Sequence, residues 1–339
     1  RRFNSRRGHS PRITNMKFRI AIVLFAIALS PLLFDSPSYA GKKIPTKDVI
    51  INVVGDVHGE AAIKREAIPA LKKYLADGNL NIFNLETAVT SEEKKEDKEY
   101  NFKTNLAFLQ SLKSTGFNLA SVSNNHSYDY GAQGFLDTLQ NLDKAGISYV
   151  GGGVNSGIAY QGQIFTVKGL KIGILGFAKV NGGPDSIAKV DKPGTTNGYD
   201  RVSTERAIVE MRKVSDVLLI LTHWGEEGSF CPRDSELSSA KKWLALGADI
   251  IVGGHTHTLQ PIEFQSNKLV AYSMGNFIFY SSELTNRTTG ILKIRISPKK
   301  RISYTMRPFV INNLTKVPEP SEPRAVIPAC EDQAKTTVR

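Results

Sequence analysis

The sequence predicts an α/β fold in which a second, more antiparallel sheet packs on an α/β core. Strand-like and helix-like segments alternate through roughly the first two thirds of the chain, as they do in α/β proteins. From residue 262 onward, strand-like segments follow one another without helices between them. The histidine-bearing motifs follow apolar runs, and open α/β sheets bind ligands beyond the carboxyl ends of their strands.

The elements are expected where apolar residues run together as strands or recur with helical spacing. The expected strands of the α/β part cover residues 48–54, 81–85, 117–122, 148–150, 163–167, 170–175, 217–221 and 249–252. The expected helices cover residues 60–76, 106–115, 135–145, 204–214 and 235–246. Further strands are expected over residues 262–264, 269–272, 290–296 and 302–310.

The remaining segments define the limits of the predicted domain. Residues 91–99 form a charged run that is typical of a solvated loop, and residues 180–200 form a long loop rich in Gly, Pro and Asn. Four prolines after residue 312 indicate a loosely held tail over residues 313–339. We therefore expect one domain over residues 45–312.

The first 40 residues have the composition of a targeting segment. Residues 1–15 are rich in arginine, and Met16 opens a basic start, an apolar run over residues 20–34 and small residues at 38–40. We expect residues 1–15 to lie upstream of the natural start and residues 16–40 to be a signal peptide. The alternative is an uncleaved N-terminal anchor, although the run is short for a span of about 20 residues. Either outcome predicts export to the periplasm, the envelope or the medium.

Net charge and cysteine content limit the partners. Without residues 1–40 the chain keeps 37 basic and 31 acidic residues, a net charge of +6. This excess is compatible with an anionic substrate or envelope polymer, and we expect no nucleic-acid partner. Cys231 and Cys330 are the only cysteines, and they form either a disulfide that holds the tail or two free thiols.

Polar residues at the ends of the predicted strands suggest one shared metal site. Every histidine after Met16 belongs to this set, which comprises Asp56, His58, Glu86, Asn125, His126, His223, His255 and His257. In extended backbone, residues two apart point to the same side, so His255 and His257 can aim at one point. We prefer a shared site to scattered surface histidines because each motif follows an apolar run.

The types of side chain favour a catalytic metal site over a structural zinc site. Carboxylate, imidazole and amide oxygen are present without thiolate, a combination that suits Mn, Fe or Zn. The candidate ligands exceed what a single ion needs, whereas two divalent ions about 3.5–4 Å apart would use them all. Such a pair lowers the pKa of a water molecule and holds both oxygens of an in-line displacement.

The order of these motifs resembles the calcineurin-like metallophosphoesterase superfamily, and more closely the bacterial capsule-synthesis CapA family, which is linked to poly-γ-glutamate. The similarity spans residues 49–310. Its pieces are Asp56-Val57-His58, Asn84-Leu85-Glu86, Ser123-Asn124-Asn125-His126 with Asp129-Tyr130-Gly131, His223-Trp224-Gly225, Gly254-His255-Thr256-His257 with Leu259-Gln260-Pro261, and Tyr272-Ser273-Met274-Gly275-Asn276-Phe277. The resemblance implies a four-layer α/β/β/α sandwich of two packed mixed sheets flanked by helices.

The resemblance also implies roles for these residues. One ion would be held by Asp56, His58 and His257. The other would be held by Asn125, His223 and His255. Glu86 would bridge the two ions, and His126 would act as general acid rather than as a ligand.

This chain departs from the superfamily pattern at two places. Glu86 stands where the pattern has Asp, and Asn124 and Ser127 replace the Gly and Asp that flank the Asn-His pair. Asp129 either orients His126 or caps the following helix. Outside the ligand set, Lys103 is a candidate anion contact or an ordinary surface lysine, and Asn276 lies at the site rim or in a turn.

Two functions from different classes follow. The first is a hydrolase of phosphoesters or γ-glutamyl bonds. The second is a metal-binding capsule component with little or no catalysis, which would bind polymer carboxylates within a membrane-bound synthesis and export complex.

Overall fold

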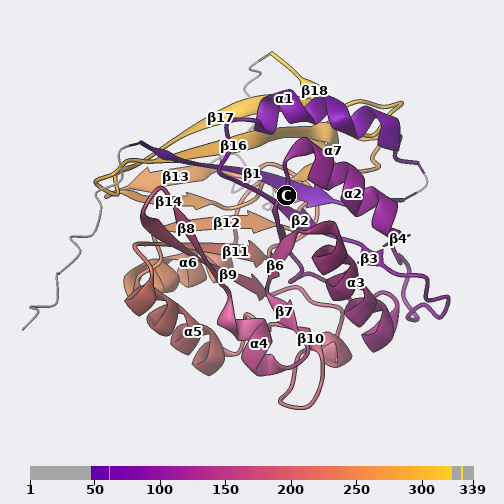
Figure 1. The fold of residues 1–339 in the computed structure, drawn as a ribbon, viewed down its shortest axis with the longest axis horizontal. Helices are drawn as coiled ribbons and strands as arrows, with labels where there is room; N and C mark the ends of the chain where they lie inside the picture. The colour runs from indigo at the N-terminus through magenta and orange to yellow at the C-terminus, as the bar shows by residue number, and fades with distance from the viewer. Residues whose placement is uncertain (1–46, 61, 323–329, 331–339) are drawn as a thin grey trace, which may run out of the picture. The chain divides into compact units, whose positions relative to one another are not determined.

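The computed structural model describes residues 47–60, 62–322 and 330 of the chain. The expectations for residues 1–15 and 16–40 concern a part of the chain outside these ranges. Within them, every helix is too short or too polar to cross a lipid bilayer. Figure 1 shows two groups of helices with the strands between them.

The first sheet combines strands from both ends of the described chain. In spatial order its strands are β18 (Pro318–Pro320), β17 (Ile302–Ile311), β16 (Thr288–Ile296), β1 (Val49–Val57), β2 (Leu80–Leu85), β5 (Leu119–Ser121) and β6 (Ser148–Val150). β1, β2, β5 and β6 are parallel to one another. β16 pairs antiparallel with β1, and β17 pairs antiparallel with β16. β15 (Asn276–Ile278) pairs in parallel with the end of β1, at Asp56 and Val57.

The second sheet is also mixed. Its order is β13 (Ile262–Gln265), β14 (Lys268–Ala271), β12 (Ile250–Gly254), β11 (Val217–His223), β9 (Leu170–Ala178) and β8 (Gln163–Val167). β9, β11, β12 and β14 are parallel, and β8 and β13 pair antiparallel at the two edges. The strands after residue 262 are therefore shared between the two sheets, which corrects the expectation that they form a sheet of their own. The reason is that β16 pairs with β1 and β14 with β12.

Three apolar layers hold the molecule together. Side chains such as Ile51, Ile82, Leu219 and Val252 fill the space between the two sheets. The helices η1 (Arg65–Leu71), α1 (Lys72–Leu75), α2 (Leu106–Thr115) and α3 (Gly131–Ala145) cover the outer face of the first sheet. α4 (Ser156–Gln161), α5 (Arg201–Val214) and α6 (Asp234–Leu246) lie on the outer face of the second. The predicted four-layer α/β/β/α sandwich is confirmed.

The structure differs from the expected elements at several places. The helix expected over residues 60–76 is instead the 3₁₀ helix η1 followed by the short helix α1; Pro69 lies inside η1 and cannot donate a backbone hydrogen bond. β15 and α4 were not predicted. Residues 313–320 are not a loose tail, since β18 pairs with β17 and Val317 is buried. The remaining short elements are β3 (Ala88–Val89), β4 (Lys103–Thr104), β7 (Gly152–Gly153), β10 (Gly194–Thr195), η2 (Pro184–Ser186) and α7 (Leu284–Arg287).

The two cysteines form a disulfide. Cys231, in the loop before α6, is bonded to Cys330, and their Cα atoms are 5.5 Å apart. Linking residues 99 apart in sequence restricts the unfolded chain and typically contributes about 2–4 kcal/mol to the free energy of unfolding.

Candidate metal centre

The site forms where the carboxyl ends of the two sheets meet. Asp56 ends β1 in the first sheet, and His223 ends β11 in the second. The backbone N–H of His255, just after β12, donates to Asp56 Oδ2 at 3.2 Å. This hydrogen bond joins the two sheets at the centre of the candidate site.

Asp56 is fully buried and ionised. Asn84 Nδ2 donates to its Oδ1 at 2.9 Å, and His257 Nδ1 lies 3.5 Å from its Oδ2. Burial opposes ionisation, but the contact with His257 and the nearby His223 outweigh it and lower the pKa of Asp56 to about 2. Asp56 therefore carries its negative charge inside the protein at neutral pH.

Glu86, which follows β2, has no hydrogen-bond donor for its buried carboxylate. Neither oxygen accepts a hydrogen bond from the part of the chain that the structure describes, and His223 Nε2 lies 3.4 Å from Oε1. Burial and the charge of Asp56 raise the pKa of Glu86 well above its ordinary value. An ionised carboxylate in this position needs a cation beside it.

Three histidines come from the second sheet. The ring centroids of His223 and His255 are 4.7 Å apart, and those of His255 and His257 are 6.2 Å apart. Burial lowers the pKa of His223 well below its usual value and that of His255 to about 4. Both rings are therefore neutral at pH 7, which is the form that binds metal.

The backbone of the Gly254-His255-Thr256-His257 loop is not extended, contrary to the expectation from the sequence. His255 has a φ of 92° and His257 a φ of 58°, values that are costly for residues with a side chain. The imidazoles are thus brought together by a tight loop in the left-handed region rather than by strand alternation. Such strain costs about 1–3 kcal/mol per residue and tends to occur at functional sites.

Two overlapping groups of side chains could hold a metal ion. One group is Glu86, His223 and His255, and the other is Asp56, Glu86 and His257, with the ligand atoms of each group within 4.8 Å of one another. The unpartnered oxygens of Glu86 and the unpartnered Nδ1 of His255 fit this assignment, because a bound cation would satisfy them. Glu86 belongs to both groups.

The other two expected ligands are placed differently. His58 belongs to neither group, and its Nε2 accepts a hydrogen bond from the backbone N–H of Tyr280 at 3.0 Å. Its Nδ1 is buried without a partner among the residues described, and burial lowers its pKa to about 3. Asn125 Oδ1 lies 2.7 Å from His223 Nε2, beside the first group.

His126 and Asp129 form a buried pair next to the ligand groups. His126 Nδ1 lies 2.9 Å from Asp129 Oδ2, which also accepts the backbone N–H of Phe102 at 2.6 Å. Asp129 does not cap α3, whose N-cap residue is Tyr130. The Lys98 ammonium forms an ion pair with Asp129 and donates to the carbonyl of Asn125 at 2.9 Å.

A network of amides explains the substitutions at positions 124 and 127. Asn124 Nδ2 donates to Asn84 Oδ1 and to the carbonyl of Leu85, at 3.0 and 2.9 Å. Its Oδ1 accepts the backbone N–H of His126 and the hydroxyl of Ser127, both at 3.0 Å. These bonds fix the loop that carries Asn125 and His126 to the strand that precedes Glu86.

A cavity of about 510 Å³ opens beside these residues. His58, His126 and His257 line it together with Phe102 and Phe279. Phe102 stacks on His58 with ring centroids 4.9 Å apart, and the ring centroids of Phe102 and His126 are 4.3 Å apart. The cavity wall next to the candidate ligands is therefore largely aromatic.

The two candidate substrate contacts have different surroundings. Lys103 points away from the centre, since its ammonium donates to the carbonyl of Glu92, pairs with Glu93 and lies over the ring of Tyr130. Asn276 is buried in β15, and its Oδ1 lies 2.8 Å from His257 Nδ1. This contact orients the imidazole of His257.

Sequence reasoning missed three residues of this site. Asn84 had a usable signal, since it is an amide in a mostly apolar strand, two residues before Glu86. Lys98 had none, because it is one of several charges in residues 91–99. Phe102 lies in an irregular segment and is recognisable only from its ring contacts.

The fold and the ligand groups define an α/β sandwich of two mixed sheets whose residues could hold a metal ion. The family model described as "Bacterial capsule synthesis protein PGA_cap" matches residues 50–281, and the chain belongs to this family. The predicted membership of the CapA capsule-synthesis group is confirmed.

Named relatives agree with this membership. The chain is 33% identical over 242 residues to "PGA biosynthesis protein CapA" of Bacillus subtilis (strain 168), covering 69% of this chain and 62% of the relative. It is 33% identical over 219 residues to "Capsule biosynthesis protein CapA" of Bacillus anthracis, covering 61% and 52%. It is 26% identical over 223 residues to "Probable polyglutamine synthesis accessory protein Rv0574c" of Mycobacterium tuberculosis (strain ATCC 25618 / H37Rv), covering 63% and 58%. The chain thus spans about half to three fifths of the length of these relatives.

Proposed function

We propose that this chain is an exported, metal-dependent hydrolase of the capsule-synthesis type, which cleaves phosphoester or γ-glutamyl bonds of a capsule-associated polymer. The observation that carries the proposal is the buried carboxylate of Glu86, which accepts no hydrogen bond from the residues that the structure describes and belongs to two ligand groups. Two divalent ions, Mn, Fe or Zn, fit this arrangement.

The chain's own residues supply binding and proton transfer. When bound, the ions would provide Lewis acidity and lower the pKa of a water nucleophile. Asp56, Glu86, His223, His255 and His257 would hold them, with His58 and Asn125 beside them. Asp129 accepts a hydrogen bond from Nδ1–H of His126, so Nε2 of His126 remains for a proton that passes to the leaving group. The aromatic cavity wall would reduce the access of competing water.

The experiment uses the full chain loaded with Mn²⁺, an aryl phosphate and an oligo-γ-glutamate. We expect turnover of at least one of the two, and His126→Ala should reduce it about 10²- to 10⁴-fold while elemental analysis shows the metal retained. Glu86→Gln should instead lose the metal. A metal-loaded protein without turnover on either class of bond would disprove the hydrolase.

A second candidate is a metal-binding capsule component with little catalysis, working with synthesis or export proteins of the membrane. The names of the relatives favour it, because they describe synthesis rather than cleavage. Copurification of membrane proteins with an inactive, metal-loaded chain would support this candidate over the first.

The disulfide supports the proposal that the protein is exported. A pair such as Cys231–Cys330 persists in oxidising compartments and is rare in the reducing cytosol. Labelling of intact cells with a membrane-impermeant reagent tests this directly, since an exported protein is labelled and a cytosolic one is protected.

A further inference from the structure

A second cavity lies between α5 and α6, on the outer face of the second sheet. It has a volume of about 340 Å³, within the range of about 300–1,000 Å³ that is usual for small-ligand sites. Lys179 reaches it from the residue after β9, and the backbone N–H of Lys179 donates to the carbonyl of His223 at 2.8 Å. The cavity therefore begins beside the strand end that carries a candidate ligand.

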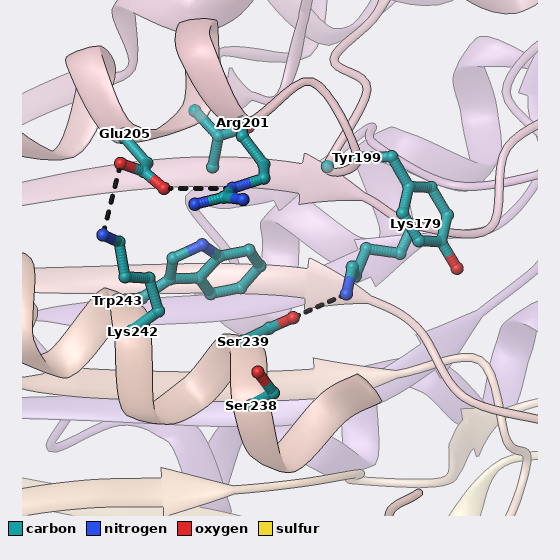
Figure 2. Close-up of a pocket in the computed structure, with 10 residues that line it drawn as sticks. Lys179, Tyr199, Arg201, Glu205, Ser238, Ser239, Lys242 and Trp243 are labelled. Carbon is teal, nitrogen blue, oxygen red and sulfur yellow. Dashed lines mark hydrogen bonds and ion pairs between the residues drawn. The ribbon is translucent and has the colours of Figure 1, made fainter. Parts of the chain in front are cut away.

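The lining carries three cations and one carboxylate. Figure 2 shows Lys179, Arg201 and Lys242 around the indole of Trp243, with Glu205 between Arg201 and Lys242. Glu205 pairs with both, at 3.4 Å from Arg201 Nε and 3.5 Å from Lys242 Nζ. One carboxylate cannot neutralise three cations, so the cavity keeps a positive excess.

Trp243 forms the floor of the cavity. It is 4% exposed and stacks on Trp224, with ring centroids 5.5 Å apart and an angle of 11° between the planes.

The cations are separated rather than convergent. In Figure 2 the amines of Lys179 and Lys242 lie on opposite sides of the indole, and the Lys179 amine is held by Ser239 Oγ at 2.5 Å and lies over the ring of Tyr199 at 4.8 Å. A single phosphate is best held by donors that converge on it. Separated cations next to an aromatic ring are complementary to a polymer whose carboxylates are separated by methylene groups.

We propose that the cavity between α5 and α6 binds carboxylates of a glutamate polymer, as a subsite whose lining residues are separate from the candidate metal ligands. The inference rests on the proposed function in its choice of polymer, but its binding step needs no turnover. The methylene groups of the chain would contact the small exposed edge of Trp243, and its carboxylates would pair with Lys179, Lys242 and Arg201.

The test is calorimetric binding of hexa-γ-glutamate to the full chain, in chelator so that the metal centre does not contribute. Lys242→Gln and Arg201→Gln should each weaken binding about tenfold, the usual effect of losing one charge-assisted hydrogen bond. Both side chains are well exposed, at 47% and 81%, and their replacement leaves the fold intact. The matched control is Lys241→Gln, one position along α6 and outside the lining, which should bind like the unchanged protein.

Three outcomes overturn the inference. These are no binding of the hexapeptide, equal weakening by Lys241→Gln and Lys242→Gln, and binding of inorganic phosphate that competes fully at the same concentration. The hydrolase proposal is judged separately, by turnover of the metal-loaded protein. Hydrolysis without hexapeptide binding would reject the subsite alone, whereas Lys242-dependent binding without hydrolysis would reject only the enzyme.

Discussion

Lys98 is the side chain that connects the charged loop over residues 91–99 to the chemistry of the site. Its ammonium pairs with the buried Asp129, which in turn holds His126. Without this cation, the buried carboxylate of Asp129 loses its ion pair and its orientation is less fixed. Lys98 is thus a positioning residue, even though a charged run is usually a solvated surface.

Substitution of Lys98 should therefore affect turnover. We expect Lys98→Met to lower kcat about tenfold, with Lys98→Arg restoring most of the rate because the charge returns. Lys103→Met is the matched control, since Lys103 pairs with Glu93 and not with the candidate site. Steady-state kinetics with the aryl phosphate measures both. Equal kcat values for the two methionine variants would contradict a positioning role.

The buried histidines make the stability of the metal-free protein depend on pH. Burial lowers the pKa of His58 to about 3 and that of His255 to about 4, and that of His223 lies well below its usual value. Unfolded histidines titrate near 6.5, so below that pH the unfolded state binds more protons than the folded state. Stability must therefore fall as the pH falls. Glu86, Glu60 and His257, whose pKa values are raised, oppose this slope.

The expected slope is measurable by urea unfolding in chelator between pH 7.5 and 5. Each of these histidines contributes up to about 1.4 kcal/mol per pH unit, before the opposing contributions of Glu86, Glu60 and His257. We therefore expect the free energy of unfolding to drop over this window. A constant value across it would mean that these rings are not buried in their neutral form.

At the scale of elements, the close approach of β1 and β15 sets the position of Asn276. A Cβ atom on Gly55 would lie 1.8 Å from the carbonyl oxygen of Gly275, which accepts the backbone N–H of Asp56 at 2.8 Å. We expect Gly55→Ala to lower the free energy of unfolding by about 1–3 kcal/mol and to weaken metal binding. Thermal unfolding and elemental analysis measure these effects. Gly157→Ala, at an exposed position of α4, should leave both nearly unchanged.

The elements also show what a sequence can predict here. β1, β2, β11 and β12 are rich in apolar and β-branched residues, so the strand ends that carry Asp56, Glu86, His223 and His255 were predictable. β15 was not, because three residues after Gly275 carry no pattern of their own and become a strand by pairing with β1. The positive φ of His255 likewise comes from tertiary packing, which no local propensity encodes.

At the scale of the whole molecule, the sequence predicted the order of strands and helices better than the pairing of strands that are distant in sequence. The alternation of strands and helices is local, whereas the pairing of β16 with β1 joins residues more than 200 positions apart. The contact of Lys98 with Asp129 and the pairing of β18 with β17 likewise depend on how distant segments meet.

The ligands of each candidate group come from both sheets. Asp56 and Glu86 follow strands of the first sheet, and the three histidines follow strands of the second. A cation bound between these ligands would link the two sheets. Metal binding should therefore slow local unfolding at the strand ends of both sheets. Addition of Mn²⁺ should therefore slow amide hydrogen exchange at the ends of both β2 and β12. Protection of only one of these strand ends would show that the ion is bound by ligands of one sheet alone.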